Sequence, residues 1–321
     1  MTNTNNKIFV ALSSFSQFGN EPIDILNQSK IEYSINPLGR RLIEEEIIEM
    51  GSNSTGIIAG VEPYSAQVLE LLPRLNCISR AGVGMDNIHL GYAEEHGITI
   101  KNTPDVVIQP VVELTFAMIF DLLRRTTDHT IILKSKEWRK VPGNNLTGKT
   151  IGIIGAGRIG RAVAETLIKF NVKVVVHDIH PEEEWAQANG VQFVGFTELL
   201  KNVDIISIHV APGDTDTFLL GKKEIQKMKK GVLIINTARG SFIDEIALCE
   251  GLNSGHVGGA GMDVFPAEPY KGNLIDCDNV LLTPHVATLT KESRLEMEIE
   301  ATLNLLGYFN SSPERNTIRS N

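Results

Sequence analysis

The chain has 321 residues, of which 42% are hydrophobic and 21% charged, and its formal net charge is −9. This length exceeds the usual size of one domain, so we expect two domains with separate cores. The negative net charge argues against nucleic acid as a partner, because binding to a phosphate backbone needs a basic face. The sequence has no run of eighteen apolar residues, and its leader MTNTNNK has no apolar signal segment. We therefore expect a cytoplasmic protein with no membrane partner.

Cysteine and glutamate usage adds two smaller predictions. Cys77, Cys249 and Cys277 lack the spacing of a metal site, and an odd, low count fits free thiols in a reducing compartment. We interpret all three as packing residues and expect no bound metal. Runs of three glutamates at residues 44–46 and 182–184 are interpreted as solvated helix faces or first turns, and we assign them no function.

The first hundred residues alternate short β-rich runs with amphipathic segments. The β-rich runs occupy residues 7–12, 31–35, 55–60, 77–82 and 98–102. The helical candidates occupy residues 41–50, 65–72 and 88–96. This alternation is typical of a parallel sheet whose strands are connected by helices. The sequence therefore predicts an α/β domain in this part of the chain.

A second α/β series begins with a long apolar helix, predicted over about residues 106–126. Its expected strands begin at Ile151, Val172, Asp204, Val232, Gly259 and Val280. A last helix is predicted over residues 292–309. We expect its apolar face to be formed by Leu295, Ile299, Leu303 and Leu306. The chain as a whole thus predicts two α/β domains, each with a parallel sheet.

The most informative segment, IGIIGAGRIG at residues 151–160, places three glycines between a buried strand and a helix. Gly155 permits a tight turn, Gly157 lets the backbone approach a pyrophosphate, and Gly160 allows the helix to pack closely on the strand. The helix N-terminus offers N–H groups and a partial positive charge to phosphates. The segment predicts a dinucleotide-binding turn, with an ordinary strand–helix–strand unit as the alternative.

Asp178 closes the next strand, 18 residues after Gly160. A carboxylate at this place can accept hydrogen bonds from an adenosine ribose and would repel a ribose 2′-phosphate. NAD is therefore favoured over NADP. His177 and His180 flank this carboxylate and could soften the preference. The alternative for Asp178 is a capping residue without a ligand.

Three side chains with complementary chemistry follow later strands. Arg239 follows VLIINTA, Glu268 follows GAGMDVF, and His285 follows VLLTP. Because the carboxyl ends of parallel strands meet at one edge of a sheet, we expect these side chains to lie together. A guanidinium can bind a substrate carboxylate, and an imidazole oriented by a carboxylate can exchange a proton with a 2-hydroxy or 2-oxo group. With a nicotinamide alongside, the set predicts hydride transfer on a 2-hydroxy or 2-oxo acid.

Each of the three residues also has a structural alternative. Arg239 could pair with a cofactor phosphate, Glu268 could be an exposed loop acid, and His285 could be a hydrogen-bonded core histidine. Their joint occurrence behind a dinucleotide motif favours the catalytic interpretation.

Seven segments in this order resemble the D-isomer-specific 2-hydroxyacid dehydrogenases, and among them the 3-phosphoglycerate dehydrogenase branch. They read RAGVGMDNI, NTP, GAGRIG, DIISIHV, INTARG, GMDVFPAEP and TPHVAT, and the likeness covers nearly the whole chain. The resemblance implies that Arg239, Glu268 and His285 are catalytic, with His285 as the proton donor.

The family fold implies a flavodoxin-like substrate domain and an inserted Rossmann NAD-binding domain. The first would comprise residues 1–104 and 288–321, and the second residues 105–287. Catalysis would take place in the cleft between them, where hinge closure would exclude water. The helix at residues 106–126 and the segment to residue 142 resemble the family's dimerisation arm, so a homodimer is expected. An ordinary core helix is the alternative.

The resemblance also implies ligand contacts. The NAD contacts would be Gly155, Gly157, Arg158, Ile159, Gly160, Asp178, His209 with the loop after it, Thr237, Ala238 and Asp263. Asp263 would lie near the nicotinamide amide. The backbone of Val83 and Gly84 would hold the substrate carboxylate, because consecutive N–H groups form an anion nest; a plain tight turn is the alternative. Arg80 would bind a substrate phosphate or form an interdomain salt bridge.

The expected substrate is a small anionic acid, with 3-phosphoglycerate first and glyoxylate, hydroxypyruvate or another D-2-hydroxy acid as alternatives. Two segments depart from the family pattern. Residues 105–110 read DVVIQP where glycine and then asparagine are usual, which allows a changed substrate preference, and residues 211–217 read APGDTDT. The chain ends at Asn321, so no C-terminal regulatory domain and no serine feedback are expected. The alternative from another class is an NAD-sensing binding protein that resembles co-repressors of this fold.

Overall fold

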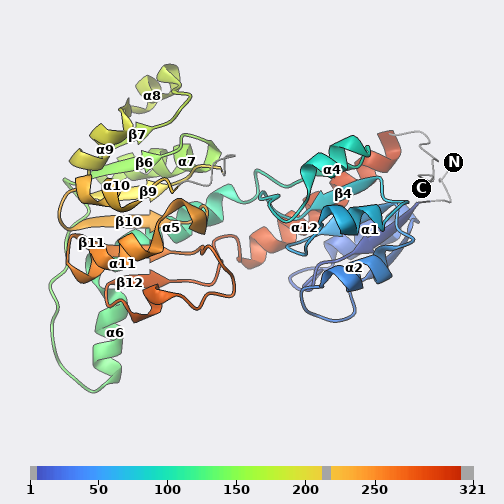
Figure 1. Cartoon of the computed structure of the whole chain (residues 1–321), viewed down its shortest axis with the longest axis horizontal. Coiled ribbons are helices and arrows are strands. Elements are labelled where there is room, and N and C mark those ends of the chain that lie inside the picture. The colour runs from blue at the N-terminus through green and yellow to red at the C-terminus, as the bar shows by residue number, and fades with distance from the viewer. Residues whose placement is uncertain (1–5, 212–217, 312–321) are drawn as a thin grey trace. The chain divides into compact units, whose positions relative to one another are not determined.

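The computed structural model describes residues 6–211 and 218–311 of the chain. The chain divides into two compact units (Figure 1). Unit 1 comprises Met1–Val107 and Leu289–Asn321, and unit 2 comprises Ile108–Thr288. The C-terminal helix thus returns to the unit that holds the first strands. Among the described residues, no helix has both the length and the apolarity needed to cross a membrane.

Unit 1 contains a five-stranded parallel sheet in the order β2-β1-β3-β4-β5. The strands are β1 (Lys7–Val10), β2 (Glu32–Ile35), β3 (Gly56–Ala59), β4 (Cys77–Arg80) and β5 (Thr99–Lys101). This is the flavodoxin-like order, so the predicted fold class is confirmed for this unit. Strand β3 is buried along its whole length, as expected for a central parallel strand that is covered on both faces.

Helices cover both faces of this sheet. They are α1 (Glu21–Ser29), α2 (Glu44–Gly51), α3 (Ala66–Glu70), α4 (Leu90–Glu95) and α12 (Lys291–Ser311). Side chains of α2, α3 and α4 enter one core cluster with the sheet, and α1 packs on α12. Helix α1, in which only Pro22 and Leu26 are buried, is not among the helices predicted from the sequence. With so few apolar positions the helix shows little periodicity.

The prediction of which face of α12 is buried was wrong. The residues that the helix buries are Ser293, Met297, Glu298, Ala301, Thr302 and Leu305. Leu303, which was expected on the buried face, is 53% exposed. The cause is tertiary: α12 lies so close to the sheet that the Ser79 hydroxyl donates a 2.7 Å hydrogen bond to the Ala301 carbonyl oxygen. Such an approach favours small side chains, and Ser293, Ala301 and Thr302 are buried there beside the larger Met297 and Leu305.

Unit 2 contains a seven-stranded parallel sheet in the order β12-β11-β10-β9-β6-β7-β8. The strands are β6 (Thr150–Ile154), β7 (Lys173–His177), β8 (Gln192–Phe193), β9 (Ile205–Ile208), β10 (Val232–Asn236), β11 (Val257–Met262) and β12 (Val280–Leu282). Strands β6 to β11 lie in the order β8-β7-β6-β9-β10-β11, which is the strand order of a Rossmann domain, and β12 is added at the edge next to β11. The predicted fold class is therefore confirmed for this unit. The two-residue strand β8 is too short for a periodic signal, and it was not predicted.

Two core clusters lie on the two faces of the unit 2 sheet. The helices are α5 (Ile108–Arg124), α6 (Thr126–Lys134), α7 (Arg158–Leu167), α8 (Glu183–Asn189), α9 (Phe196–Asn202), α10 (Lys222–Lys227) and α11 (Glu245–Asn253). Helices α5, α7 and α8 contribute to one cluster, and α9, α10 and α11 contribute to the other. Helix α7 therefore packs against the strand that leads into the glycine-rich turn.

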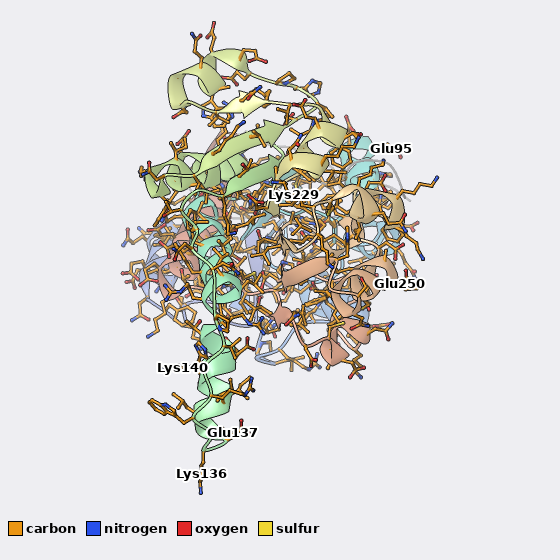
Figure 2. All side chains as sticks on the ribbon, turned by 90° about the vertical axis from the view of Figure 1, so that its left-hand side faces the viewer. Glu95, Lys136, Glu137, Lys140, Lys229 and Glu250 are labelled. Carbon is orange, nitrogen blue, oxygen red and sulfur yellow. The ribbon has the colours of Figure 1, made fainter. Side chains whose placement is uncertain are left out.

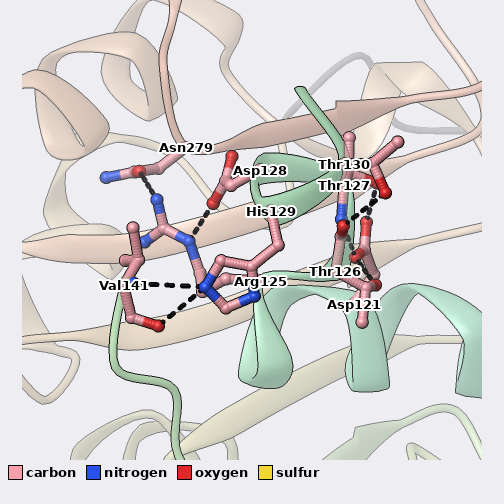
Figure 3. Close-up of polar contacts among 9 residues, drawn as sticks. All are labelled: Asp121, Arg125, Thr126, Thr127, Asp128, His129, Thr130, Val141 and Asn279. Carbon is pink, nitrogen blue, oxygen red and sulfur yellow. Dashed lines mark hydrogen bonds and ion pairs between the residues drawn. The ribbon is translucent and has the colours of Figure 1, made fainter. Parts of the chain in front are cut away.

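The helix predicted over residues 106–126 is the first of two helices. Arg125 separates α5 from α6 and has a left-handed backbone with φ 55°. The Asp121 carboxylate accepts hydrogen bonds from the hydroxyl of Thr126 and from the backbone N–H and hydroxyl of Thr127, the last two at 2.8 and 2.5 Å (Figure 3). The start of α6 is therefore capped from the preceding helix, a contact that periodicity does not report.

Candidate active site

The carboxyl ends of β10, β11 and β12 lie next to one another at one edge of the unit 2 sheet. Asn236 of β10 is in register with Met262 of β11, and Met262 is in register with Leu282 of β12. Arg239 and His285 each come three residues after the last residue of their strand. The structure therefore brings the two residues to neighbouring strand ends of the same sheet.

A close backbone contact also joins the Arg239 segment to the segment that leads to Glu268. Gly240 packs on Phe265 and Pro266 so tightly that a Cβ at Gly240 would lie 2.0 Å from the Phe265 carbonyl carbon. Only glycine allows this approach. The chain after β10 thus supports the chain after β11.

His285 and Glu268 are hydrogen-bonded to each other. The His285 Nδ1 lies 2.9 Å from Glu268 Oε2, and Glu268 Oε1 accepts a 3.1 Å hydrogen bond from the Phe265 backbone N–H. The side chains of His285 and Glu268 are 50% and 38% exposed, so both remain accessible to a small molecule. A carboxylate at Nδ1 makes that nitrogen the donor and leaves Nε2 for proton exchange with a substrate.

Asp263 holds the turn that carries His285. His285 has a left-handed backbone with φ 54°, a strained conformation for a residue with a side chain. Its N–H donates to the carbonyl oxygens of Asp263 and Thr283, both at 2.9 Å. The fully buried Asp263 carboxylate accepts from the Thr283 hydroxyl at 2.5 Å and from the N–H groups of Val286 and Ala287 at 2.8 and 2.9 Å. Both carboxylate oxygens are thus bonded to the His285 turn, while the expected contact of Asp263 with nicotinamide stays a prediction.

Asn236 shapes the turn that carries three predicted residues. Its side-chain amide donates to the Arg239 carbonyl oxygen at 2.8 Å and accepts from the Ala238 N–H at 3.0 Å. Arg239 Nη1 donates to the Ala238 carbonyl oxygen at 2.7 Å, and the Thr237 hydroxyl lies 3.4 Å from that of Thr115. Sequence reasoning missed Asn236, although a polar residue that ends an otherwise apolar strand is a usable signal.

The glycine-rich turn fits the pyrophosphate of NAD. Gly155 has φ 98°, and a Cβ at Gly160 would lie 1.9 Å from the Gly155 carbonyl oxygen. Gly157 caps α7, and no heavy atom of the described residues lies within 4 Å of the position its Cβ would take. Arg158 and Ile159 are the first two residues of this helix. An open backbone at the start of a ten-residue helix is what a bound phosphate requires.

Asp178 is tied to the same turn. Its Oδ2 accepts a 2.6 Å hydrogen bond from the Ala156 N–H, and its Oδ1 accepts a 2.8 Å bond from the His180 N–H. These bonds fix the carboxylate beside the phosphate turn and leave lone pairs for ribose hydroxyls. His177 points elsewhere, with its Nδ1 3.1 Å from the Val194 carbonyl oxygen.

His209 lies under the glycine-rich turn. Its ring is hydrogen-bonded to the Ser207 hydroxyl at 2.8 Å, and its carbonyl oxygen would lie 2.6 Å from a Cβ at Gly155. Burial of the ring lowers the pKa of His209 to about 3, which keeps the imidazole neutral. The backbone of His209 thus packs against the glycine-rich turn, and its ring is bonded to Ser207. The loop after His209 was expected to contact the cofactor, and its residues 212–217 lie outside the described residues.

The predicted substrate-binding residues lie in a tight turn of unit 1. Gly82 has φ 133°, and its N–H donates to the Thr103 hydroxyl at 2.8 Å. The side chain of Arg80 folds over this glycine and donates from Nη1 to the Ala81 carbonyl oxygen at 3.0 Å. Val83 is 38% exposed, and Gly84 after it is partly exposed. The turn is thus well defined, and its contact with a substrate stays a prediction.

A cavity of about 360 Å³ in unit 2 lies at the amino ends of the strands, away from these residues. Lys149, Asp204 and Lys229 are among the residues that line it, and the Lys229 ammonium lies 3.0 Å from the Asp204 carboxylate. None of the predicted site residues lines this cavity. Among the described residues there is also no group of three or more His, Cys, Asp or Glu side chains that could hold a metal ion.

Comparison with known proteins agrees with this geometry. The family model described as D-isomer specific 2-hydroxyacid dehydrogenase, NAD binding domain, matches residues 116–287. The chain is 41% identical over 265 residues to the D-3-phosphoglycerate dehydrogenase of Bacillus subtilis, which covers 82% of this chain and 50% of that protein. It is 34% identical over 294 residues to the hydroxypyruvate reductase of Thermotoga maritima, which covers 88% and 94%. The chain therefore spans about half the length of the first relative and nearly all of the second.

A solved structure shows the same architecture over nearly the whole chain. The crystal structure of a glyoxylate reductase from Paecilomyes thermophila superposes with a TM-score of 0.86 at 28% sequence identity. The match covers 96% of both chains.

Proposed function

This chain belongs to the D-isomer-specific 2-hydroxyacid dehydrogenase family, and from that premise we propose that it interconverts a D-2-hydroxy acid and its 2-oxo acid, with 3-phosphoglycerate as the leading substrate. The observation that carries the proposal is the 2.9 Å hydrogen bond between His285 and Glu268 at the strand edge that also presents Arg239. The glycine-rich turn and Asp178 supply the NAD site in the same unit.

In the proposed mechanism each catalytic side chain has one task. When bound, NAD would accept the hydride in oxidation, and NADH would donate it in reduction. The Nε2 of His285 takes the proton of the 2-hydroxyl group, or returns it to the oxygen during reduction. Glu268 keeps Nδ1 protonated and stabilises the imidazolium that forms. Arg239 binds the substrate carboxylate and polarises the neighbouring carbonyl group.

We assign further substrate contacts, beyond that of Arg239, to residues of unit 1, and cofactor binding to unit 2. The backbone at Val83 and Gly84 offers N–H groups to the substrate carboxylate, and Arg80 offers a cation to a phosphate group. The 41% identity to a D-3-phosphoglycerate dehydrogenase supports 3-phosphoglycerate. Matches to a hydroxypyruvate reductase and a glyoxylate reductase support those smaller acids as the alternative.

A panel of 2-oxo and 2-hydroxy acids, with and without phosphate, tests this proposal through NADH oxidation and NAD reduction. We expect the highest kcat/KM with 3-phosphoglycerate and its oxo partner. The Arg80→Gln variant should then lose that preference and keep its activity on acids without phosphate. Activity on glyoxylate or hydroxypyruvate alone would replace 3-phosphoglycerate as the substrate. Tight NADH binding without turnover on any acid would contradict the enzymatic function and favour an NAD-sensing protein.

We further propose that the chain forms a homodimer through an arm formed by residues 126–142, which begins with α6. Ile131, Leu133 and Trp138 are 61%, 56% and 84% exposed, more apolar surface than a short segment of a monomer usually presents. Figure 2 shows the arm extending from the rest of unit 2, with Lys136, Glu137 and Lys140 labelled along it. Light scattering should give the mass of a dimer, and the triple variant Ile131→Ser, Leu133→Ser, Trp138→Ser should give that of a monomer. A monomeric parent chain would refute the proposal.

A further inference from the structure

An ion pair beside the predicted ribose site involves a glutamate of the run at residues 182–184. The Arg161 Nη2 lies 2.5 Å from Glu182 Oε2. Arg161 directly follows the last glycine of the phosphate-binding turn, and Glu182 directly precedes α8. The pair therefore bridges the start of α7 and the loop that follows Asp178.

The Arg161 guanidinium is held close to Asp178. Its Nε donates a 2.7 Å hydrogen bond to the Ala156 carbonyl oxygen, and the Ala156 N–H donates a 2.6 Å bond to Asp178 Oδ2. One residue of the glycine-rich turn thus contacts both side chains. The hydrogen bond to Glu182 raises the pKa of Arg161, and the charge of Asp178 contributes to the same shift. The guanidinium also stacks over the Trp185 ring, 5.1 Å from its centroid, which restricts its movement.

This position matters because it is where NADP differs from NAD. The ribose 2′-hydroxyl of NAD binds next to the acid that ends the second strand, and NADP carries a phosphate there. An arginine beside a 2′-phosphate binds it through two parallel N–H groups. Arg161 would offer such a site if its guanidinium were not already paired.

We propose that Glu182 is a specificity-determining residue, which selects NAD over NADP by occupying the Arg161 guanidinium and adding a second carboxylate beside Asp178. Two effects act in the same direction. The pair removes a cation that would attract the 2′-phosphate, and its carboxylate repels that phosphate. The inference rests on the NAD site of the proposed function and is independent of the acid that the enzyme reduces.

A purely structural role predicts a different result. The Glu182 side chain is 55% exposed, so solvent screens the ion pair and its contribution to stability is small. If the pair only anchored α8, its loss would lower the melting temperature slightly and would change the affinities for NADH and NADPH by the same factor. Selective tightening of NADPH binding is specific to the proposed role.

The test measures the binding of NADH and NADPH to the whole chain by calorimetry, so that it needs no substrate. In Glu182→Gln we expect the affinity for NADPH to rise roughly tenfold, while that for NADH stays within about twofold. Glu183→Gln is the matched control, because it removes the same charge from the next residue and leaves Arg161 paired. Arg161→Gln in the Glu182→Gln background should abolish the gain, since the gain requires the guanidinium.

An equal rise in NADPH affinity in Glu182→Gln and Glu183→Gln would overturn the inference, because general charge would then explain it. Persistence of the gain without Arg161 would overturn it as well. Failure of the parent chain to bind NADH would instead refute the proposed cofactor site, so the two failures can be distinguished. Thermal melting of each variant shows whether it is folded at the temperature of the titration.

Discussion

Glu268 and His285 meet through a 2.9 Å hydrogen bond although they follow different strands, β11 and β12. The backbone N–H of Phe265 binds the other oxygen of the same carboxylate, so its orientation is fixed from both sides. The imidazole is thus held in one tautomer, while half of the His285 side chain stays exposed. This arrangement suits a general acid and base better than a histidine that only fills space.

His285→Ala should lower kcat by about 10²- to 10⁴-fold, the usual contribution of a positioned proton donor. NADH binding should change little, because the glycine-rich turn and Asp178 do not contact the imidazole. Steady-state kinetics and NADH titration measure the two effects separately. Turnover close to that of the parent chain would mean that another group carries the proton.

Glu268→Gln should lower kcat by roughly ten- to a hundredfold, less than the loss of His285, because it removes one charged hydrogen bond and keeps the imidazole. The neutral amide has one oxygen for two donors, His285 and the Phe265 N–H. We expect the affinity for NADH to be unchanged. A variant as inactive as His285→Ala would indicate that the carboxylate itself contacts the reacting atoms.

Asp263→Asn should destabilise unit 2 by about 1–3 kcal/mol, because an amide nitrogen would replace a buried oxygen that accepts hydrogen bonds. The loss should also lower kcat, since the same carboxylate holds the left-handed turn at His285. Urea unfolding and steady-state kinetics measure these effects. Thr283→Ser keeps the hydroxyl that contacts Asp263, so it is the matched control and should retain activity. Full stability and activity in Asp263→Asn would disprove a positioning role.

Asp178→Ala should weaken NADH binding by about ten- to a hundredfold, because the ribose loses a charged acceptor and the Ala156 N–H loses its partner. Asp178→Asn retains one acceptor oxygen for that N–H, so its effect on NADH should be smaller. Both variants should bind NADPH relatively better than the parent chain does, which fluorescence titration with the two cofactors measures. The role of Asp178 in selecting NAD fails if the ratio of the two affinities stays the same.

The pH dependence of stability should carry a contribution from His209. Its pKa is lowered to about 3 by burial, whereas an unfolded histidine titrates near 6.5. The unfolded chain therefore binds the proton more readily, and this contribution is present above about pH 6.5 and is lost as the pH falls towards 3. The expected slope is at most about 1.4 kcal/mol per pH unit.

Urea unfolding at pH 7, 6 and 5 tests this prediction, because few carboxyl groups titrate in that range. His209→Gln should flatten the dependence of the unfolding free energy on pH. His180→Gln replaces an exposed histidine and should leave the slope unchanged. An unchanged slope in His209→Gln would show that the ring titrates alike in the folded and unfolded states.

Most strands and the fold class could be predicted from the sequence, because a buried parallel strand is a short apolar run with glycine or proline at its ends. The elements that escaped prediction have little periodicity of their own. Helix α6 begins after a left-handed residue and is capped by Asp121 of the preceding helix. The buried face of α12 depends on how closely that helix approaches β4, and the apolar pattern pointed to another face.

The sequence by itself determined the two parallel sheets, the glycine-rich turn and the three side chains at strand ends, because each depends on local spacing along the chain. Only the tertiary structure decided which partner each carboxylate has. Asp263 binds the turn at His285, Glu268 binds the imidazole, and Glu182 pairs with Arg161. These contacts join residues 17 to 24 positions apart in the sequence. Hydrogen bonds of this range depend on how strands and helices pack, and hydrophobic periodicity reports only which face of each element is buried.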